Sequence, residues 1–164
     1  SLIKILSGAQ EATVNAPSYL INGDTIPAVE AGRICSLAAP YAELNPMFSL
    51  KETIEFHAEM CGFSPEVDIN HWISKAGLKS HLNKRLKTFS SGMKQRVRLL
   101  LAVASPRPLL LLDEPTSNLD KDGVEFYKSL IRELALEKTI IVASNYIKHE
   151  YEFCKGELLL EKHY

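Results

Sequence analysis

A run of four leucines, residues 109–112, leads directly into Asp113-Glu114-Pro115, and this feature most constrains the fold. A short, continuous apolar run bounded by turn residues indicates a strand that is buried on both faces, as in a parallel sheet. Two adjacent carboxylates at the end of such a strand can divide a task, the first holding a magnesium-bound water and the second polarising an attacking water. We therefore expect Asp113 to hold the metal and Glu114 to be catalytic.

A turn of small residues, Ser90-Ser91-Gly92, precedes a helix that is expected to run from about residue 91 to residue 104. Such a turn exposes free backbone N–H groups at the positive end of the helix dipole, which suits a terminal phosphate. Most turns of this kind are ordinary helix N-caps. The combination with the acidic pair after the helix is what indicates nucleotide chemistry.

Composition and charge exclude several classes of protein. The chain has 164 residues, of which 46% are hydrophobic, enough for one domain or for a core with a small satellite subdomain. Its 19 Lys and Arg residues balance 20 Asp and Glu residues without a long run of either sign, so nucleic acid is not an expected partner. Cys35, Cys61 and Cys154 lack metal-ligand spacing and are expected to be reduced thiols.

The N-terminal part predicts short elements, namely a helix over residues 2–6, edge strands over 13–21, a turn at 22–24 and a buried strand over 33–38. Gly8 provides a C-cap signal for the first helix, and Pro17 confines its strand to an edge. Because no loop precedes the first helix, we expect that residues ahead of Ser1 complete the fold. A processed terminus is the alternative.

The hydrophobic period changes from 2 to 3.6 at Ser49. Ser49 and Glu52 form a capping-box pattern before a helix, and this helix is expected to place three side chains on one face, those of Ile54, Ala58 and Cys61. A second helix is expected to open at residues 64–65 and to end at Gly77, with inward side chains at Ile69, Trp72, Ile73 and Ala76. Residues 46–88 therefore predict an all-helical subdomain inserted between two parts of an α/β core, residues 1–45 and 89–164.

The second half of the chain predicts a strand at 109–112, a helix over 122–137 and a strand over 139–143. This order favours a parallel sheet with right-handed crossovers, in which functional groups gather where the strands end. Asp113-Glu114 and Ser144-Asn145 both follow strands. In contrast, three basic side chains of the helix after Ser90 are expected to form a solvated face: Lys94, Arg96 and Arg98. The histidines are expected to be surface or hydrogen-bonded residues: His57, His71, His81, His149 and His163.

Three motifs together resemble the nucleotide-binding domain of ATP-binding-cassette (ABC) transporters. Residues 89–96 resemble the family's signature motif, residues 109–115 its Walker B strand with the glutamate, and residues 116–120 its D-loop. The resemblance covers nearly the whole chain, since residues 46–88 lie where the family places its helical subdomain. It implies a P-loop NTPase-like parallel sheet that is truncated at its N-terminus, with the Walker A loop just ahead of Ser1. Residues 1–164 alone are therefore expected to bind ATP poorly and to be inactive.

The resemblance also implies ATP and Mg²⁺ as ligands. Asp113 would hold the metal and Glu114 the attacking water, and the remaining nucleotide-binding positions would be Ser90, Ser91, Gly92, Asp120 and Asn145. The signature residues would contact ATP that is bound to an opposite domain, and Asp120 would couple the two sites. Ser91 stands where the family usually has a glycine.

Two positions depart from the family in ways that affect catalysis. The Q-loop glutamine falls at Ala39, which can position neither metal nor water. The switch histidine falls at Asn145, which can donate a hydrogen bond but cannot carry a proton. These changes leave a second hypothesis open, a degenerate cassette with a regulatory or structural role and little hydrolysis of its own.

The partners implied are a second nucleotide-binding domain, identical or not, and a transmembrane permease subunit that residues 40–50 would face. The expected location is cytoplasmic, at the inner face of the cell membrane through that subunit. A third hypothesis is a cassette ATPase that acts on DNA or ribosomes, but the long heptad insertions and basic extensions typical of such proteins are missing from this sequence.

Overall fold

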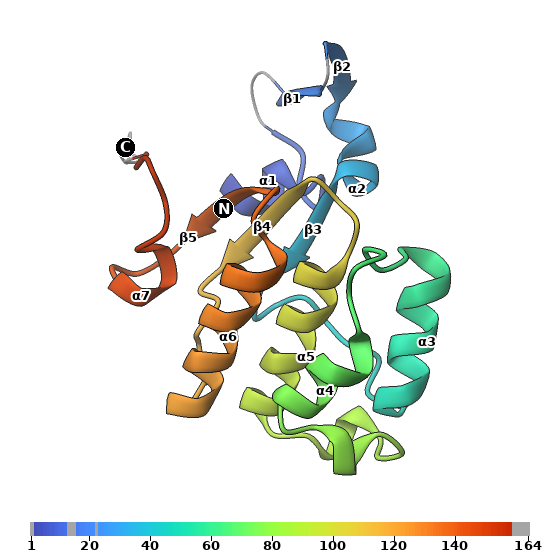
Figure 1. Cartoon of the computed structure of the whole chain (residues 1–164). Helices are drawn as coiled ribbons and strands as arrows, with labels where there is room; N and C mark the ends of the chain where they lie inside the picture. The colour runs from blue at the N-terminus through green and yellow to red at the C-terminus, as the bar shows by residue number, and fades with distance from the viewer. Residues whose placement is uncertain (1, 13–15, 22, 159–164) are drawn as a thin grey trace.

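The computed structural model describes residues 2–12, 16–21 and 23–158. A parallel sheet lies at its centre in the order β3 (Cys35–Ala38), β4 (Leu109–Asp113) and β5 (Thr139–Ala143). Three helices connect β3 to β4: α3 (Leu50–Met60), α4 (Ile69–Lys75) and α5 (Ser91–Ala104). Helix α6 (Lys121–Leu134) connects β4 to β5. Helices α5 and α6 lie on one face of the sheet and α1 (Leu2–Leu6) on the other (Figure 1). The α/β class predicted from the sequence is confirmed.

The two faces of β4 pack against different layers, because successive side chains of a strand point in opposite directions. Leu110 and Leu112 lie in the larger core with α5 and α6. Leu109 and Leu111 face the other way and pack with Ile3 of α1. Burial on both faces explains why this strand is a continuous leucine run and does not alternate with polar residues.

The N-terminal elements follow the sequence prediction in part. The first helix ends as expected, with Gly8 in the left-handed region at φ +74°. Strands β1 (Ser18–Ile21) and β2 (Asp24–Pro27) form an antiparallel hairpin, and residues 13–15 and 22 of the predicted strands and turn lie outside the described residues. A 3₁₀ turn (Ala28–Glu30) and helix α2 (Ala31–Ile34) follow. The strand predicted over 33–38 is therefore shorter, because its first two residues belong to α2.

Helix α3 begins with the predicted capping box. The Ser49 side chain accepts from the backbone N–H of Glu52, and the Glu52 side chain accepts from the Ser49 N–H at 2.7 Å. The predicted inward face is wrong at Ala58, which is exposed. Thr53 is buried beside Ile54 instead, so the buried stripe lies nearer the start of the helix.

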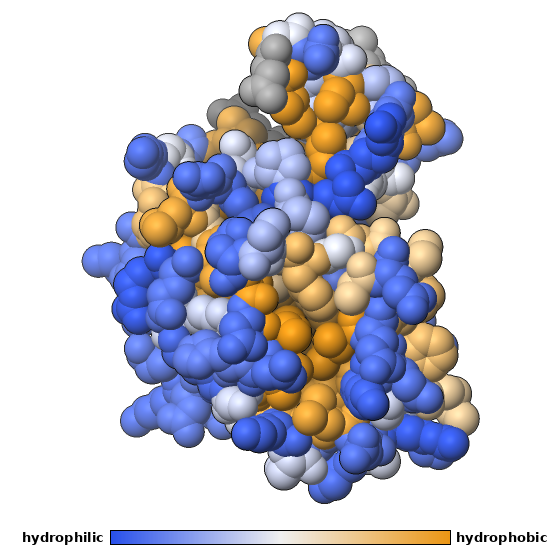
Figure 2. Space-filling model, turned by 45° about the vertical axis from the view of Figure 1, so that its right-hand side comes forward, coloured by the Kyte–Doolittle hydropathy of each residue, from blue (hydrophilic) through white to orange (hydrophobic). Residues whose placement is uncertain are grey.

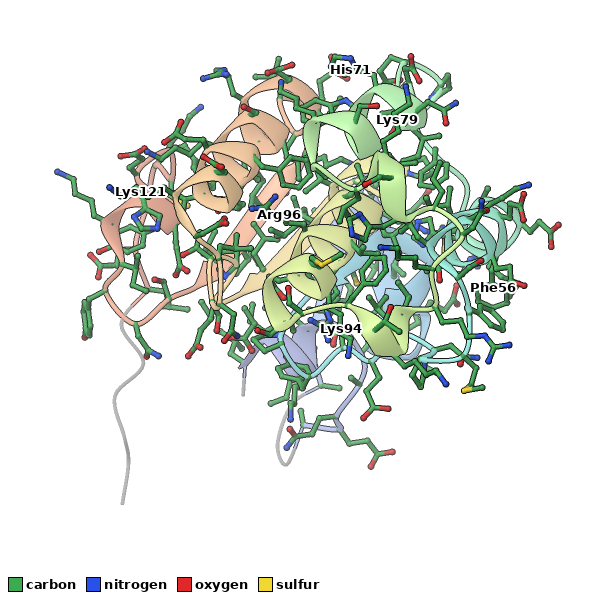
Figure 3. The ribbon with its side chains drawn as sticks, turned by 90° about the horizontal axis from the view of Figure 1, so that it is seen from below. Phe56, His71, Lys79, Lys94, Arg96 and Lys121 are labelled. Atoms are coloured by element: carbon green, nitrogen blue, oxygen red, sulfur yellow. The ribbon has the colours of Figure 1, made fainter. Side chains whose placement is uncertain are left out.

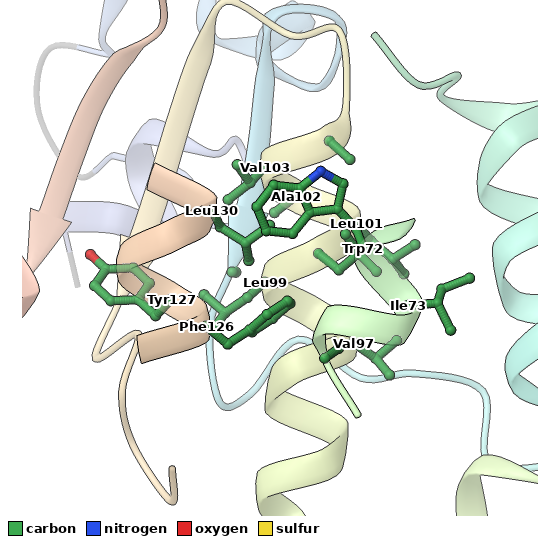
Figure 4. Packing of buried hydrophobic residues seen from close by; sticks show 14 of the residues in the cluster. Trp72, Ile73, Val97, Leu99, Leu101, Ala102, Val103, Phe126, Tyr127 and Leu130 are labelled. Carbon is green, nitrogen blue, oxygen red and sulfur yellow. The ribbon is translucent and has the colours of Figure 1, made fainter. Parts of the chain in front are cut away.

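Helix α4 begins later than the sequence predicts. Its N-cap is Asp68, whose carboxylate accepts from two backbone N–H groups, and the Ser64-Pro65 pair forms part of the preceding turn. The predicted inward residues Trp72 and Ile73 are buried. The Trp72 ring meets Phe126 of α6 edge-on, with ring centroids 6.1 Å apart, and so ties the 46–88 segment to the core (Figure 4). Two 3₁₀ turns, Lys79–His81 and Leu86–Thr88, complete that segment.

Helix α5 and strand β5 have the predicted bounds, whereas α6 ends at Leu134, three residues earlier than predicted, and is followed by buried Ala135. The short helix α7 (Lys148–Tyr151) follows β5. In the part of the chain that the structure describes, no helix is both long enough and apolar enough to cross a membrane.

We predict that Leu111→Ala lowers the free energy of unfolding by about 2–5 kcal/mol, because it opens a cavity in a strand whose two faces are covered. Leu111 is 0% exposed. The measurement is urea denaturation followed by circular dichroism. Leu136→Ala is the matched control, since Leu136 is 80% exposed, and it is expected to change stability by no more than about 0.5 kcal/mol. Equal losses in the two variants would contradict the layered packing.

The burial of His57 makes the stability of the protein depend on pH. Contrary to expectation, the His57 Nε2 is buried without a hydrogen-bond partner among the described residues, and its ring stacks on Phe63 at 5.1 Å. Burial, and secondarily the positive charge of Arg107, lower the pKa of His57 below 6.5. The unfolded chain therefore takes up a proton at a higher pH than the folded one, and stability falls as pH drops below this value.

We expect the free energy of unfolding to fall between about pH 7.5 and pH 5.5, and to fall less in His57→Leu, which has no imidazole to protonate. Parallel urea denaturation series at several pH values measure the difference. Identical pH dependence in both proteins would show that His57 is not the group responsible.

Candidate functional site

The loops after β4 and β5 bring Glu114 and Asn145 together, as the sheet topology predicts. The backbone N–H of Glu114 donates to the Ala143 carbonyl at 2.8 Å, which extends the pairing of β4 with β5 by one residue. Glu114 itself has φ +45°, a strained left-handed conformation for a residue other than glycine. Its Oε1 accepts from Asn145 Nδ2 at 2.5 Å. One carboxylate oxygen of Glu114 is thus fixed by the amide.

Asp113 closes β4 and is half-buried beside a tyrosine that the sequence did not single out. Burial, then a hydrogen bond with Asp113 and the charge of that carboxylate, raise the pKa of Tyr41 to about 12. Lys4 Nζ lies 4.4 Å from the centroid of the Tyr41 ring. Helix α1 and the loop after β3 therefore meet near Asp113.

Asp113 can hold Mg²⁺ if water and substrate phosphates supply the remaining ligands. Among the described residues, no group of three or more His, Cys, Asp or Glu side chains converges as a metal cage. Mg²⁺ does not need such a cage, since it is commonly held by one or two carboxylates together with water and substrate phosphates. Ala39, the predicted Q-loop position, is 0% exposed and offers no side-chain oxygen. Asp113 accordingly stays the predicted metal-binding position.

The signature turn forms a second group of predicted residues. Ser90 is the N-cap of α5, and its hydroxyl accepts from the backbone N–H of Met93 at 3.2 Å. A pocket of about 360 Å³ lies over this turn, and its lining residues are Ser90, Ser91, Gly92, Met93, Arg96, Asn118 and Asp120. Four predicted site residues thus share one pocket, separate from the pair formed by Glu114 and Asn145.

Close backbone packing explains the glycine in this turn. A Cβ atom on Gly92 would lie 2.7 Å from the carbonyl oxygen of Asn118, a distance that side chains do not tolerate. Asn118 is in the left-handed region, at φ +62°. The start of α5 and the loop 114–120 are therefore in direct contact.

The sequence predicts that Arg96 belongs to a solvated face of the helix. This prediction is wrong. The Arg96 side chain is 18% exposed, pairs with Asp120 at 2.5 Å and donates to the Ala76 carbonyl at 2.9 Å (Figure 3). Asp120 also accepts from the Gly123 N–H at 2.8 Å as the N-cap of α6. The Gly123 N–H and secondly Arg96 lower the pKa of Asp120. Arg96 thus links α4, α5 and the start of α6.

Arg98 is also inward and corrects the same prediction. Its Nε donates to the Ala42 carbonyl at 2.6 Å. Neighbouring Gln95, which the sequence reasoning missed, is 1% exposed and donates to the Pro115 carbonyl at 3.0 Å. A signal was available, because Gln95 lies four residues before buried Leu99, on the inward side of the helix.

Comparisons with known proteins agree with this architecture. The ABC transporter family model matches residues 1–117, and the chain belongs to this family. The bacitracin transport ATP-binding protein BcrA of Bacillus licheniformis is 34% identical over 122 residues, which cover 74% of this chain and 39% of that protein. The lantibiotic transport ATP-binding protein SrtF of Streptococcus pyogenes is 29% identical over 175 residues, covering 100% of this chain and 73% of that protein.

Solved structures agree in fold. An ATP-binding subunit of an ABC transporter superposes with a TM-score of 0.79 at 24% identity, covering 93% of this chain and 65% of that one. The dimeric cassette MJ0796 in a post-hydrolysis state with ADP and Pi gives a TM-score of 0.71 at 19% identity, covering 91% of this chain and 70% of that one. The chain spans less than half the length of several of its curated relatives.

We predict that Gly92→Ala destabilises the protein by about 1–3 kcal/mol, because its methyl group must displace the Asn118 carbonyl. The helix propensity of alanine alone would predict the opposite sign. Gly32→Ala in α2 is the control, since nothing lies within 4 Å of its added Cβ. Thermal and urea unfolding measure both variants, and stabilisation by Gly92→Ala would contradict the close packing.

Proposed function

We propose that this chain is part of the ATP-hydrolysing subunit of an ABC transporter, which couples ATP binding and hydrolysis to transport through a separate membrane subunit. The observation that carries the proposal is the pairing of Glu114 with Asn145 next to Asp113, where β4 and β5 end. This is the place where functional groups of parallel α/β sheets gather. The names of the relatives BcrA and SrtF, both transport ATP-binding proteins, support the same function.

In this proposal the residues of the chain divide the work of phosphoryl transfer. Asp113 would hold Mg²⁺ together with the substrate phosphates, and the ion would supply neutralisation of the phosphate charge. Glu114 orients a water molecule and accepts its proton. The amide of Asn145 holds Oε1 of Glu114, which leaves Oε2 to face the water. Asn145 acts as a hydrogen-bond donor only.

The signature pocket is proposed to serve a nucleotide on a second nucleotide-binding domain. Ser90 and Gly92 lie away from the pair formed by Glu114 and Asn145, at the N-terminus of a 14-residue helix that favours phosphate. The dimeric cassettes among the structural neighbours support such an assembly.

A membrane permease is the proposed partner of the surface around α3. Met47, in the predicted 40–50 segment, is 54% exposed, and Phe56 and Met60 of α3 are 53% and 64% exposed. Phe56 points outward from α3 (Figure 3). Figure 2 shows hydrophobic surface between hydrophilic margins on one side of the molecule. Exposed apolar side chains of this kind mark interaction sites. Docking there would hold the protein at the inner face of the membrane.

The degenerate cassette remains the second candidate, because of two particular positions. Ala39 provides no polar group for metal or water, and Asn145 cannot transfer a proton. Glu114, held in place by that same asparagine, argues against complete inactivity. The two candidates therefore differ in turnover and not in nucleotide binding.

The test is steady-state ATP hydrolysis by the full-length protein and its Glu114→Gln variant. We expect kcat to fall by about 10²–10⁴-fold, since the variant loses its general base, while ATP binding is retained. Glu125→Gln on α6 is the matched control, because Glu125 is exposed and its ion pair among the described residues is with Lys128 on the same helix. Tight ATP binding without turnover by the unmodified protein would favour the degenerate cassette.

A further inference from the structure

A buried carboxylate lies beside the candidate site but belongs to none of the predicted motifs. Glu150 of α7 is 0% exposed. Its Oε1 accepts from the backbone N–H of Thr116 at 2.9 Å and from the Thr116 hydroxyl at 2.5 Å. Its Oε2 accepts from the hydroxyl of Ser144. One side chain thus spans two loops, binding one of them with each oxygen.

These two loops are the ones that carry Glu114 and Asn145. Thr116 lies two residues after Glu114, and Ser144 directly precedes Asn145. Hydrogen bonds to a carboxylate acceptor are stronger than those between two neutral groups. The carboxylate of Glu150 is therefore well placed to fix the distance between the two loops.

Backbone strain in the same loops indicates that something must hold them. Glu114, Asn118 and Tyr146 have φ values of +45°, +62° and +60°, and none of them is a glycine. A residue other than glycine is strained in this conformation, which persists only where the surroundings impose it. All three lie two residues from a hydrogen-bond donor to the Glu150 carboxylate, Thr116 or Ser144. The hydrogen bonds to Glu150 reach both loops, in addition to the direct contacts that Glu114 makes with Ala143 and Asn145.

Glu150 is itself held by contacts from other elements. The buried Tyr127 hydroxyl of α6 donates to the Glu150 carbonyl at 2.6 Å. His149 Nε2 lies 3.1 Å from the Thr116 hydroxyl oxygen, and it is the donor in this pair because the hydroxyl proton points to Glu150. The Ile147 N–H donates to Ser144 Oγ at 3.2 Å. The backbone of Glu150 and both residues that donate to its carboxylate are therefore themselves hydrogen-bonded to other groups.

We infer that Glu150 is a positioning residue for the proposed hydrolysis. It clamps the loop that carries Glu114 to the loop that carries Asn145, and so maintains the hydrogen bond between those two side chains. The inference deepens the proposed function and rests on it for its kinetic consequence. The structural consequence, mutual restraint of the two loops, is independent of whether ATP is hydrolysed.

The first experiment is hydrogen–deuterium exchange on the full-length protein and its Ser144→Ala and Glu150→Gln variants. Among the described residues, the Ser144 hydroxyl makes no hydrogen bond to the 114–120 loop and is joined to it through the Glu150 carboxylate. Exchange in residues 114–120 is nevertheless expected to rise about tenfold in Ser144→Ala, the equivalent of one lost hydrogen bond to a charged group. Ser74→Ala is the control, because the Ser74 hydroxyl bonds only within α4. Unchanged exchange in 114–120, or a uniform rise throughout the chain, would overturn the clamp.

The second experiment is kinetic. Glu150→Gln is expected to lower kcat by about 10–100-fold, because a displacement of roughly 1 Å at a reacting group costs this much. The KM for ATP should stay within a factor of about three, because Glu150 contacts no predicted nucleotide-binding side chain. A rise in KM with unchanged kcat would overturn the positioning role. Absence of turnover in the unmodified protein would remove the proposed function, and the exchange experiment would still decide on the clamp.

Discussion

The double-sided burial of β4 is the constraint on which the rest of the structure depends. Leu110 faces α5 and α6 while Leu111 faces α1, so a single strand joins the two layers of the molecule. Because β4 pairs with β3 on one side and with β5 on the other, its backbone is fixed as well. The backbone that carries Asp113 and Glu114 is therefore rigid, and this pre-organises their carboxylates for any chemistry that they perform.

The loop 114–120 is held between two helices that meet it from different directions. Helix α5 contacts it through Gln95 and through the close approach of Gly92, and α7 contacts it through Glu150. A loop fixed in this way can keep three left-handed residues in and beside it that would otherwise relax. Buried hydrogen bonds from two sides thus contribute to the order of this site.

The sequence predicted the elements with local signals best. The bounds of α5 followed from Ser90 and Pro106, and the capping box placed α3, but the opening of α4 was misassigned because Ser64-Pro65 imitates a helix start. The placement of Glu114 and Asn145 at the ends of parallel strands followed from the strand order, but the hydrogen bond between them did not. The inward contacts of Arg96 and the clamp by Glu150 did not, because each depends on partners far along the chain that no periodicity reveals.

The Asp120 carboxylate makes two contacts within its own chain: it caps the first turn of α6 and it forms an ion pair with Arg96. A ligand or partner that recruits this carboxylate must therefore compete with both of them. If Asp120 turns to such a ligand, Arg96 loses its ion pair with Asp120. Its hydrogen bond to the carbonyl of Ala76, the C-cap of α4, remains. Binding of a ligand to Asp120 is thus thermodynamically linked to the position of the helical segment 46–88. By reciprocity, a shift of that segment changes the affinity of Asp120 for the ligand.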